Sequence, residues 1–486
     1  MVLIEKDSRT TRLKYITDNT GLDTFIKDQY SVPNPAARFS KFAPGLLSAI
    51  SPGGIFQSGL ALDIIKLIRK MYPNEDIQIT PEARAIIKPS IVKFDHVEAL
   101  PNKSIVLRDY QEKAVEQALK HMRGTFKMAT SSGKSATITS IIHNIWHWSH
   151  KAQVLIIVPN LQLVTQFYND MIEYGIKEND IQMFSSFNKT PKKSKIIISN
   201  RDWLQEGHFR DIPEPDVVII DECQQLKRGS EISKLVAQYK TNCKFAFTGT
   251  LPDNKDDMWN VLGLTGSILY EIEPYELQNT GTIADTNIIS IKIDHGVPQP
   301  ELEDSDDPLE IAKARFTLEW RYIEQSEKSN RAIAKVCSNL VGNTIVLFDH
   351  TSHGKLIKDY CEEYKISGYN VHYIDGSTPI TERDEIKHKF ETSDNNIMVG
   401  QTKCVGTGLS IKNIINVCFA FTAGTATCKI LQIIGRGLRM KAGKTEMFLY
   451  DFYHNFRYSK DHFKQRKLLY SENYVVKSYK DKSIVL

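Results

Sequence analysis

The residues between Met128 and Ser135 have the types and the order that can bind a triphosphate. Small residues fill the first part of this segment, which lies between a short apolar run expected to form a strand and a longer one expected to form a helix. A small-residue loop lets backbone N–H groups turn toward a phosphate, and the start of a helix adds partial positive charge. We therefore expect Lys134 to reach the β- and γ-phosphates and the Ser135 hydroxyl to bind Mg²⁺.

Met128 stands where such a loop usually has its first glycine, so the segment alone also fits an ordinary turn of small residues. Support has to come from partners further along the chain. If the interpretation is right, Ser131, Ser132 and Gly133 surround the nucleotide, because they occupy the turn itself.

Two acidic residues at the end of an apolar run are the first such partners. Asp221 and Glu222 follow Val217–Ile220, which is expected to be a strand. A carboxylate placed there can bind Mg²⁺ through water, and a neighbouring carboxylate can polarise the attacking water. We assign the first role to Asp221 and the second to Glu222; the alternative is an acidic turn at a strand end.

The second group that supports a triphosphate site is an amide and two guanidiniums, from Gln432, Arg436 and Arg439. They are spaced along what is expected to be the start of a helix. A guanidinium cannot lose its charge, and its fork suits phosphate oxygens. An arginine delivered from a second domain onto a γ-phosphate stabilises the transition state and is worth about 10³–10⁵ in rate. The alternative is a basic helix end that binds its own carbonyl groups.

Composition places these residues in a chain of several domains. With 486 residues, two to four domains are expected, and 41% hydrophobic and 25% charged residues are ordinary for a globular protein. The net charge of +4 neither requires nor excludes a nucleic-acid partner. The seven cysteines include no CxxC pair, which favours reduced thiols in a cytosol-like compartment, and no apolar run has membrane-spanning length.

Continuous apolar runs predict two parallel sheets that position the candidate residues. The first set follows the phosphate loop at βαβ intervals, and such runs are typical of strands covered on both faces. The first set contains Val154–Val158, Lys195–Ile198, Val217–Ile220 and Phe245–Phe247, with Ile288–Ile291 as a further candidate. The second set contains Ile345–Phe348, Val371–Ile374, Ile397–Val399, Val417–Ala420 and Met447–Tyr450.

The expected fold is therefore α/β, with two tandem parallel-sheet domains and a small α+β domain before them. We divide the chain into residues 1–95, 96–285, 286–452 and 453–486, with a linker around Gly281–His295. The first and last parts are rich in basic and aromatic residues. Each can hold a nucleic-acid backbone; the alternative is an ordinary solvated basic face for the first part and an amphipathic helix packing on the second domain for the last part, and the sequence leaves these possibilities open.

Taken together and in this order, the motifs between about residue 105 and residue 450 resemble those of the superfamily 2 helicases. Within that family, Phe348–Lys355, Gly406–Asn413 and Gln432–Arg439 are most similar to phage recombination-repair helicases that migrate branched DNA. The resemblance implies two RecA-like domains that close on ATP and Mg²⁺. It also implies 3′-to-5′ translocation on DNA, fork regression and Holliday-junction branch migration.

The resemblance implies further site residues by matching position. Arg108 and Gln111 match the adenine-reading segment, Gly408 closes near the nucleotide, and Gln224, Thr248 and Thr250 couple hydrolysis to motion. The implied nucleic-acid contacts are Pro159, Asn160, Gln166, Ser199, Arg201, His350, Ser352, His353 and Thr407. We also expect a monomeric motor in the cytoplasm, which is the host cytoplasm if a phage encodes the protein. No membrane partner is expected.

Departures from the family pattern keep other functions open. Ser131 stands where most of the superfamily has glycine, and Gln224 cannot carry charge, so hydrolysis is better supported than its coupling to motion. An RNA-dependent ATPase or RNA helicase, or a duplex DNA translocase without strand separation, is the alternative among enzymes. A nucleic-acid-binding protein with a decayed motor is the alternative outside them.

Overall fold

The computed structural model describes residues 1–8, 12–38, 43–89, 95–186, 194–297, 308–408, 411–420, 427–441 and 443–486. Its contacts divide the chain into two units. The first contains Met1–Met128 and Gly133–Ile272, and the second contains Ala129–Ser132 and Glu273–Leu486. Among the described residues, no helix has both the length and the apolar character needed to cross a membrane.

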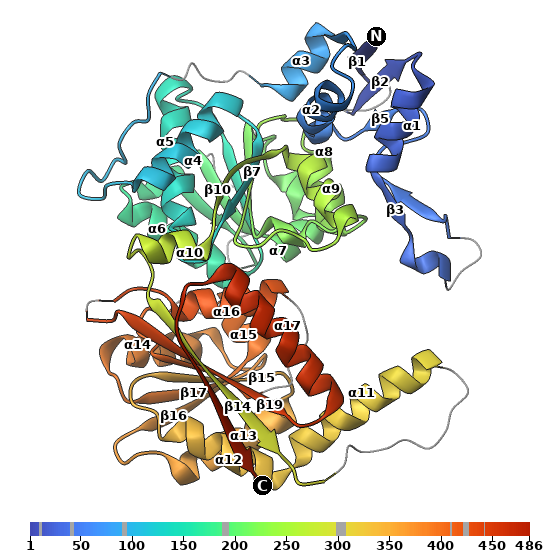
Figure 1. The fold of residues 1–486 in the computed structure, drawn as a ribbon. Coiled ribbons are helices and arrows are strands. Elements are labelled where there is room, and N and C mark those ends of the chain that lie inside the picture. The colour runs from blue at the N-terminus through green and yellow to red at the C-terminus, as the bar shows by residue number, and fades with distance from the viewer. Residues whose placement is uncertain are drawn as a thin grey trace. The chain divides into compact units, whose positions relative to one another are not determined.

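The N-terminal part of the first unit is a small mixed sheet with helices (Figure 1). Its strand order is β5-β2-β1-β6, in which β1 pairs antiparallel with β2 and parallel with β6. The elements are β1 (Val2–Lys6), β2 (Leu13–Thr17), α1 (Thr20–Gln29), β3 (Ser31–Pro33), β4 (Leu46–Ser48), β5 (Ile55–Phe56), α2 (Ala61–Met71), β6 (Ile77–Ile79) and α3 (Pro81–Ile87).

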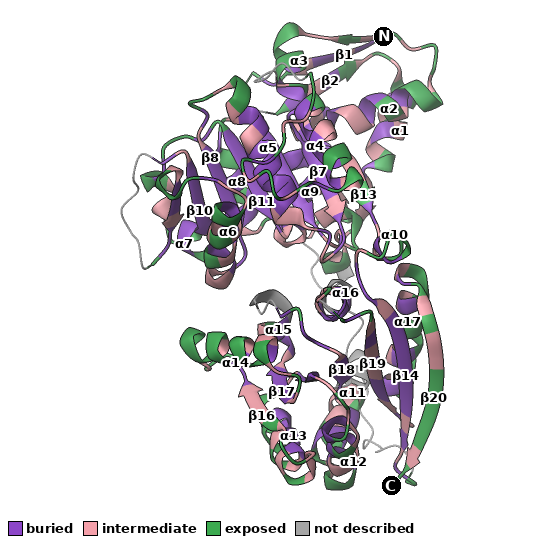
Figure 2. Cartoon of the chain, turned by 90° about the vertical axis from the view of Figure 1, so that its left-hand side faces the viewer, coloured by how far each residue is buried: buried purple, intermediate pink, exposed green. Residues whose placement is uncertain are grey.

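The rest of the first unit is a seven-stranded parallel sheet of order β13-β7-β12-β11-β8-β10-β9. Its inner strands are buried along their whole length, as the continuous apolar runs predict (Figure 2). The strands are β7 (Gly124–Met128), β8 (Val154–Val158), β9 (Ile181–Phe184), β10 (Ile196–Asn200), β11 (Val217–Asp221), β12 (Lys244–Thr248) and β13 (Ile268–Ile272). The helices are α4 (Asp109–His121), α5 (Lys134–Trp148), α6 (Leu161–Glu173), α7 (Arg201–Gln205), α8 (Glu231–Gln238) and α9 (Lys255–Thr265).

The second unit contains another seven-stranded parallel sheet, of order β16-β17-β15-β18-β19-β14-β20. The strands are β14 (Asp285–Asp294), β15 (Thr344–Phe348), β16 (Asn370–Ile374), β17 (Asn396–Gln401), β18 (Asn416–Phe419), β19 (Glu446–His454) and β20 (Val476–Val485). The helices are α10 (Pro274–Asn279), α11 (Pro308–Gln325), α12 (Glu327–Ser338), α13 (Thr351–Tyr364), α14 (Ile380–Thr392), α15 (Thr402–Gly408), α16 (Thr427–Gly437) and α17 (Arg457–Asn473). Two tandem parallel-sheet domains after a small α/β region confirm the expected fold class.

The strand β14 corrects two expectations. Ile288–Ile291 does not belong to the first sheet, and Gly281–His295 is not a linker, because β14 lies between β19 and β20 in the second sheet. Each of its central residues pairs in parallel with both neighbours, for example Ile289 with Tyr450 and Lys480. A run of β-branched residues predicts a strand, but only its partners decide which sheet it joins.

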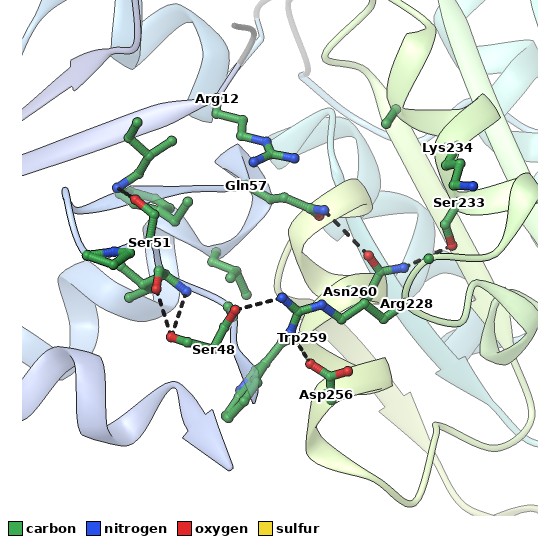
Figure 3. Close-up of a pocket in the computed structure, with 18 residues that line it drawn as sticks. Arg12, Ser48, Ser51, Gln57, Arg228, Ser233, Lys234, Asp256, Trp259 and Asn260 are labelled. Atoms are coloured by element: carbon green, nitrogen blue, oxygen red, sulfur yellow. Dashed lines mark hydrogen bonds and ion pairs between the residues drawn. The ribbon is translucent and has the colours of Figure 1, made fainter. Parts of the chain in front are cut away.

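Arg123 fastens the N-terminal part to the first parallel sheet. Its guanidinium is buried and donates to Ser58 Oγ at 2.9 Å on one side and to the Leu264 carbonyl oxygen at 3.1 Å on the other. A pocket of about 520 Å³ lies beside this seam. Figure 3 shows Gln57 pointing across to Asn260 there. These bonds make the N-terminal part a fixed component of the first unit.

The C-terminal residues pack on the second sheet. Arg466 of α17 forms a buried ion pair with Asp451 of β19, with Nη2 to Oδ1 at 2.8 Å, and the Tyr470 hydroxyl donates to Asp451 Oδ2 at 2.7 Å. The strand β20 then closes one edge of the sheet and is largely exposed (Figure 2). Packing on the second domain, one of the two possibilities left open for this tail, is therefore present.

Candidate functional site

The phosphate loop has the backbone expected of a turn around an anion. It follows β7 and leads into α5, and the φ angles of Ser131 and Gly133 are 72° and 81°. Positive φ is unfavourable for serine by about 1–2 kcal/mol, so Ser131 holds here the conformation that glycine adopts freely. Gly133 cannot be replaced easily, because its φ of 81° is a conformation that a residue with a Cβ rarely adopts.

Lys134 and Ser135 are the first two residues of α5 and remain half-buried, while most of the helix behind them is buried. The Lys134 ammonium donates to the Met128 carbonyl oxygen at 3.4 Å, a long hydrogen bond that folds its side chain back over the loop. The Ser135 hydroxyl lies 3.5 Å from the Tyr174 hydroxyl of the segment after α6. Both side chains keep access to an anion seated in the loop.

Three strand ends bring the acidic residues to the loop. In the parallel sheet β12 lies between β7 and β11, with Thr248 paired to Lys127 and Phe247 paired to Asp221. The carboxyl ends of β7, β12 and β11 therefore meet at one edge, where chemistry in open parallel sheets is found. Asp221 is buried there, and Glu222 is half-exposed with a positive φ of 54°.

The pKa of the Cys223 thiol is shifted by the same charged side chains. Burial raises this pKa, the carboxylates of Glu222 and Asp221 raise it further, and the Lys134 ammonium opposes them. Cys223 is fully buried beneath these groups. The two acids and the lysine thus act on one buried atom, which places all three at the same end of the sheet.

A chain of hydrogen bonds links this edge to the end of β12. Gln224 Nε2 donates to Glu222 Oε2 at 2.7 Å, and the Thr248 hydroxyl donates to Gln224 Oε1 at 2.6 Å. Thr248 Oγ1 also lies 2.7 Å from the Thr250 carbonyl oxygen and accepts the Thr250 N–H at 3.0 Å. The three residues matched to coupling are therefore connected to the candidate base.

The adenine-reading candidates are engaged with the protein itself. Gln111 Oε1 accepts the Arg108 N–H at 2.9 Å as a helix-capping box, and its Nε2 lies 3.4 Å from the Gly133 carbonyl oxygen. The side chain is buried, and Arg108 donates to the Tyr110 hydroxyl at 3.1 Å. In this structure Gln111 connects α4 to the phosphate loop.

The residues of the first unit that are candidates for contact with nucleic acid differ in how exposed they are. Pro159 is buried, and Ser199, expected just after a strand, is a buried residue inside β10. Both residues are covered in this structure, and their assignment as backbone contacts to nucleic acid stays a prediction. Asn160 caps α6 by accepting the Leu163 N–H, and the side chains that stay partly exposed are Asn160, Gln166 and Arg201.

In the second unit the arginine segment lies at the end of α16, not at its start as expected. Gln432 is in the helix, Arg436 is in its last turn, and Arg439 follows it. All three are half-buried whereas the residues between them are buried, and Gln432 and Arg436, four residues apart, lie on the same face of the helix. The helix lies close to the sheet at Gly437, where an added Cβ would be 2.9 Å from Val417 Cγ2.

Two loops of the second sheet hold the remaining candidates. Gln401 Nε2 donates to the Asp349 carbonyl oxygen at 3.1 Å, so the ends of β17 and β15 are joined. His350 and Ser352 are exposed there, but His353 is 1% exposed and its Nε2 lies 3.1 Å from Asn330 Oδ1, so its contact with nucleic acid stays a prediction. The Thr407 side chain and its surroundings at Gly408 lie outside what the structure describes.

Sequence reasoning missed Glu324 of α11, which lies beneath this loop. Its Oε1 is 3.3 Å from His350 Nδ1 and 3.6 Å from His353 Nδ1. Burial raises the pKa of Glu324 to about 8 and lowers the pKa of His353 to about 4. No short motif contains Glu324, so only the packing of α11 reveals it.

Comparison with known proteins agrees with this geometry. Residues 104–253 match the family model of the type III restriction enzyme res subunit, and residues 328–441 match the helicase conserved C-terminal domain. Together the two matches cover more than half of the chain. The chain is a superfamily 2 helicase. The order of the two domains is the one expected from the motifs.

Among curated relatives, this helicase is similar to the ATP-dependent DNA helicase uvsW of Enterobacteria phage T4. The two are 27% identical over 361 residues, which cover 72% of this chain and 69% of the relative. The relationship identifies this helicase as an enzyme that hydrolyses ATP.

Two solved structures share the fold. One is Dbp5 of S. cerevisiae bound to RNA and ADP BeF3, with a TM-score of 0.55 and 12% identity, covering 78% of this chain and 89% of that one. The other is the ATP-dependent type ISP restriction-modification enzyme LlaBIII bound to DNA, with a TM-score of 0.58 and 14% identity, covering 87% and 34% of the two chains.

Proposed function

We propose that this helicase is a DNA motor that acts on branched substrates, regressing forks and migrating Holliday junctions in recombination, repair or replication. The support for DNA is the similarity to a phage DNA helicase over most of the chain. The support for branched substrates is the resemblance of the three C-terminal motif segments to phage helicases of that kind.

In the proposal ATP binds at the phosphate loop and at the strand ends of the first parallel sheet. Ser131, Ser132 and Gly133 cradle the phosphates, Lys134 neutralises them, and Glu222 orients and deprotonates the attacking water. Ser135 and Asp221 fit a Mg²⁺ site, because a hydroxyl and a carboxylate are the hard oxygen ligands that Mg²⁺ prefers and both stand beside the loop. Mg²⁺ supplies positive charge to the phosphate oxygens when bound, and Arg108 and Gln111 face the adenine.

The second unit completes the reaction in the proposal. Gln432, Arg436 and Arg439 meet the γ-phosphate when the two domains close, and Gly408 approaches the nucleotide beside them. Loss of the γ-phosphate removes the contact that favours the closed state, so the domains open. This opening is coupled to the DNA-binding residues through Gln224, Thr248 and Thr250.

DNA contacts in the proposal are mostly to the backbone and come from short polar side chains at strand ends. The candidates that are exposed or partly exposed are His350, Ser352, Asn160, Gln166 and Arg201, with Thr407 added from the family pattern. We also propose that the chain is divided into domains at residues 95, 285 and 452. We propose that the helicase acts as a monomer in the cytoplasm.

One observation carries the proposal: the hydrogen-bonded chain from Thr248 through Gln224 to Glu222, at the sheet edge that also ends in the phosphate loop. The test compares the rate of ATP-driven unwinding of a labelled four-way junction with that of a plain duplex. Faster unwinding of the junction supports branched-DNA activity, and equal rates on both substrates contradict it.

A second measurement separates the alternatives. Phosphate release is compared with single-stranded DNA, duplex DNA, forked DNA and RNA added in turn. Stimulation by RNA alone identifies an RNA-dependent ATPase, and stimulation by duplex without strand separation identifies a translocase. Absence of turnover with every nucleic acid identifies a decayed motor.

A further inference from the structure

Lys444 is a buried lysine that lies between the arginine segment and β19. Its side chain is 5% exposed. The ammonium donates to the carbonyl oxygens of Gly437, of Arg439 at 2.8 Å and of Lys412 at 3.4 Å. A lysine ammonium has three donors in a compact head, so three carbonyl acceptors use it fully.

Two of these carbonyl groups belong to the backbone that carries the arginines. From residue 436 to residue 439 each carbonyl oxygen accepts a hydrogen bond. The Arg436 oxygen accepts the Arg439 N–H at 3.3 Å, and the Leu438 oxygen accepts the Ala284 N–H at 2.9 Å. Lys444 supplies the bonds to the other two, at Gly437 and Arg439. It therefore determines the path of the chain on which the two guanidiniums are mounted.

The carbonyl groups around Lys444 attract its charge, whereas burial and the nearby Arg439 guanidinium lower its pKa to about 7. The last carbonyl groups of a helix carry partial negative charge and have no partner within the helix. Lys444 meets that charge at the end of α16, where the chain turns out of the helix between Arg436 and Arg439. Its third bond reaches Lys412, whose own N–H donates to Glu391 at 2.6 Å, so the segment after α15 is held by the same side chain.

We propose that Lys444 is a positioning residue for ATP hydrolysis: it holds the end of α16 so that Arg436 and Arg439 are presented in the geometry that the γ-phosphate requires. This inference rests on the proposed function of the two arginines. Lys444 itself does not touch the nucleotide. Its removal misplaces the guanidiniums without changing the phosphate loop or the two acidic residues that bind ATP and Mg²⁺ in the proposal.

The test uses the full-length helicase and DNA-stimulated phosphate release. In Lys444→Met the chain keeps a long apolar stem but loses the three donors. We expect kcat to fall about 10–100-fold, because a misplacement near 1 Å has an effect of that order. KM for ATP is expected to stay within about twofold, because ground-state binding is unchanged.

Lys441 provides the matched control. It lies in the same loop, and its ammonium donates to the Glu391 carbonyl oxygen at 3.0 Å rather than to the arginine segment. Lys441→Met is expected to leave kcat unchanged. Thermal unfolding of each variant reports whether it folds, and if Lys444→Met does not fold, Lys444→Gln keeps a shorter amide donor and is expected to show a smaller fall in kcat.

A multiple-mutant comparison separates positioning from a general structural role. The double variant Arg436→Ala and Arg439→Ala is made first, and an unchanged kcat there refutes the proposed function of the arginines. If kcat falls as expected, Lys444→Met is added. Less than about a twofold further fall means that Lys444 acts through the arginines. A further fall as large as in the wild-type background refutes the positioning role.

Discussion

The Thr248 hydroxyl donates to Gln224 Oε1 at 2.6 Å, and the other end of the same amide donates to Glu222. An amide accepts through its oxygen and donates through its nitrogen, so the hydroxyl at one end fixes which atom faces the carboxylate at the other. The end of β12 is thereby connected to the residue that we propose as the catalytic base.

Replacing Thr248 with valine tests this connection. The substitution keeps the shape of the side chain and removes the hydroxyl, so Gln224 loses a donor and its amide is free to turn. We expect roughly a tenfold loss of DNA unwinding per ATP hydrolysed, because the link between the end of β12 and the candidate base is broken while the residues that bind ATP are unchanged. Phosphate release and unwinding are measured on the same preparation.

Thr241→Val is the control for that variant. Thr241 precedes the other end of β12, where its hydroxyl donates to the Asp216 carbonyl oxygen at 2.6 Å. It is expected to leave the ratio of unwinding to hydrolysis at the wild-type value. If both threonine variants lower that ratio equally, the effect comes from the stability of the strand rather than from coupling.

Replacing Glu222 with glutamine tests the base directly. The amide has the same size and can still accept from Gln224, but it cannot take a proton from water. We expect kcat for ATP to fall by about 10²–10⁴, the usual contribution of a general base. Single-turnover hydrolysis measures the effect, and fluorescence anisotropy with labelled DNA checks that binding persists. Turnover close to the wild-type rate would remove Glu222 from the mechanism.

Glu324 predicts a pH dependence of stability. Its pKa is raised by burial, with a contribution from Asp349, to about 8 from an ordinary value of 4.5. Between these values the native state holds a proton that the unfolded chain has released, so the free energy of unfolding falls as pH rises. In Glu324→Gln this decline is absent, and the variant is expected to be more stable than wild type by about 1–3 kcal/mol near pH 8.

Urea denaturation at several pH values measures this effect. Glu327→Gln is the control, because Glu327 begins the next helix and its side chain is 66% exposed. Its pH profile should follow that of the wild type. A Glu324→Gln profile that still declines toward alkaline pH would assign the titration to another group.

The ion pair between Arg466 and Asp451 predicts a loss of stability. Both side chains are almost completely buried, so Arg466→Met leaves a carboxylate without its cation in the interior. We expect the second unit to lose about 3–5 kcal/mol, as is usual when one partner of a buried pair is removed. The control is Lys464→Met on the same helix, which removes an exposed ion pair with Asp461 and is expected to cost less than about 1 kcal/mol of stability. Thermal unfolding of the two variants measures the difference.

Much of the fold could be predicted because its signals are local. Runs such as Val154–Val158 and Val217–Ile220 are apolar along their whole length, which only strands buried on both faces require. The order of loop, acidic pair and arginine segment indicated the family in the same way. Weaker strands were missed, and β13 and β20 carry exposed or half-exposed residues without a continuous apolar run.

The sequence by itself determined the chemistry that is available: a lysine and hydroxyl after a small-residue loop, two carboxylates after an apolar run, and two arginines near an amide. Tertiary structure alone decided which of these groups are accessible and what holds them. It buried His353 and Ser199, placed β14 in the second sheet, and brought Glu324 and Lys444 beside segments distant in the chain. The reason is physical: residue type and spacing act over a few residues, whereas burial and hydrogen-bond partners depend on long-range packing.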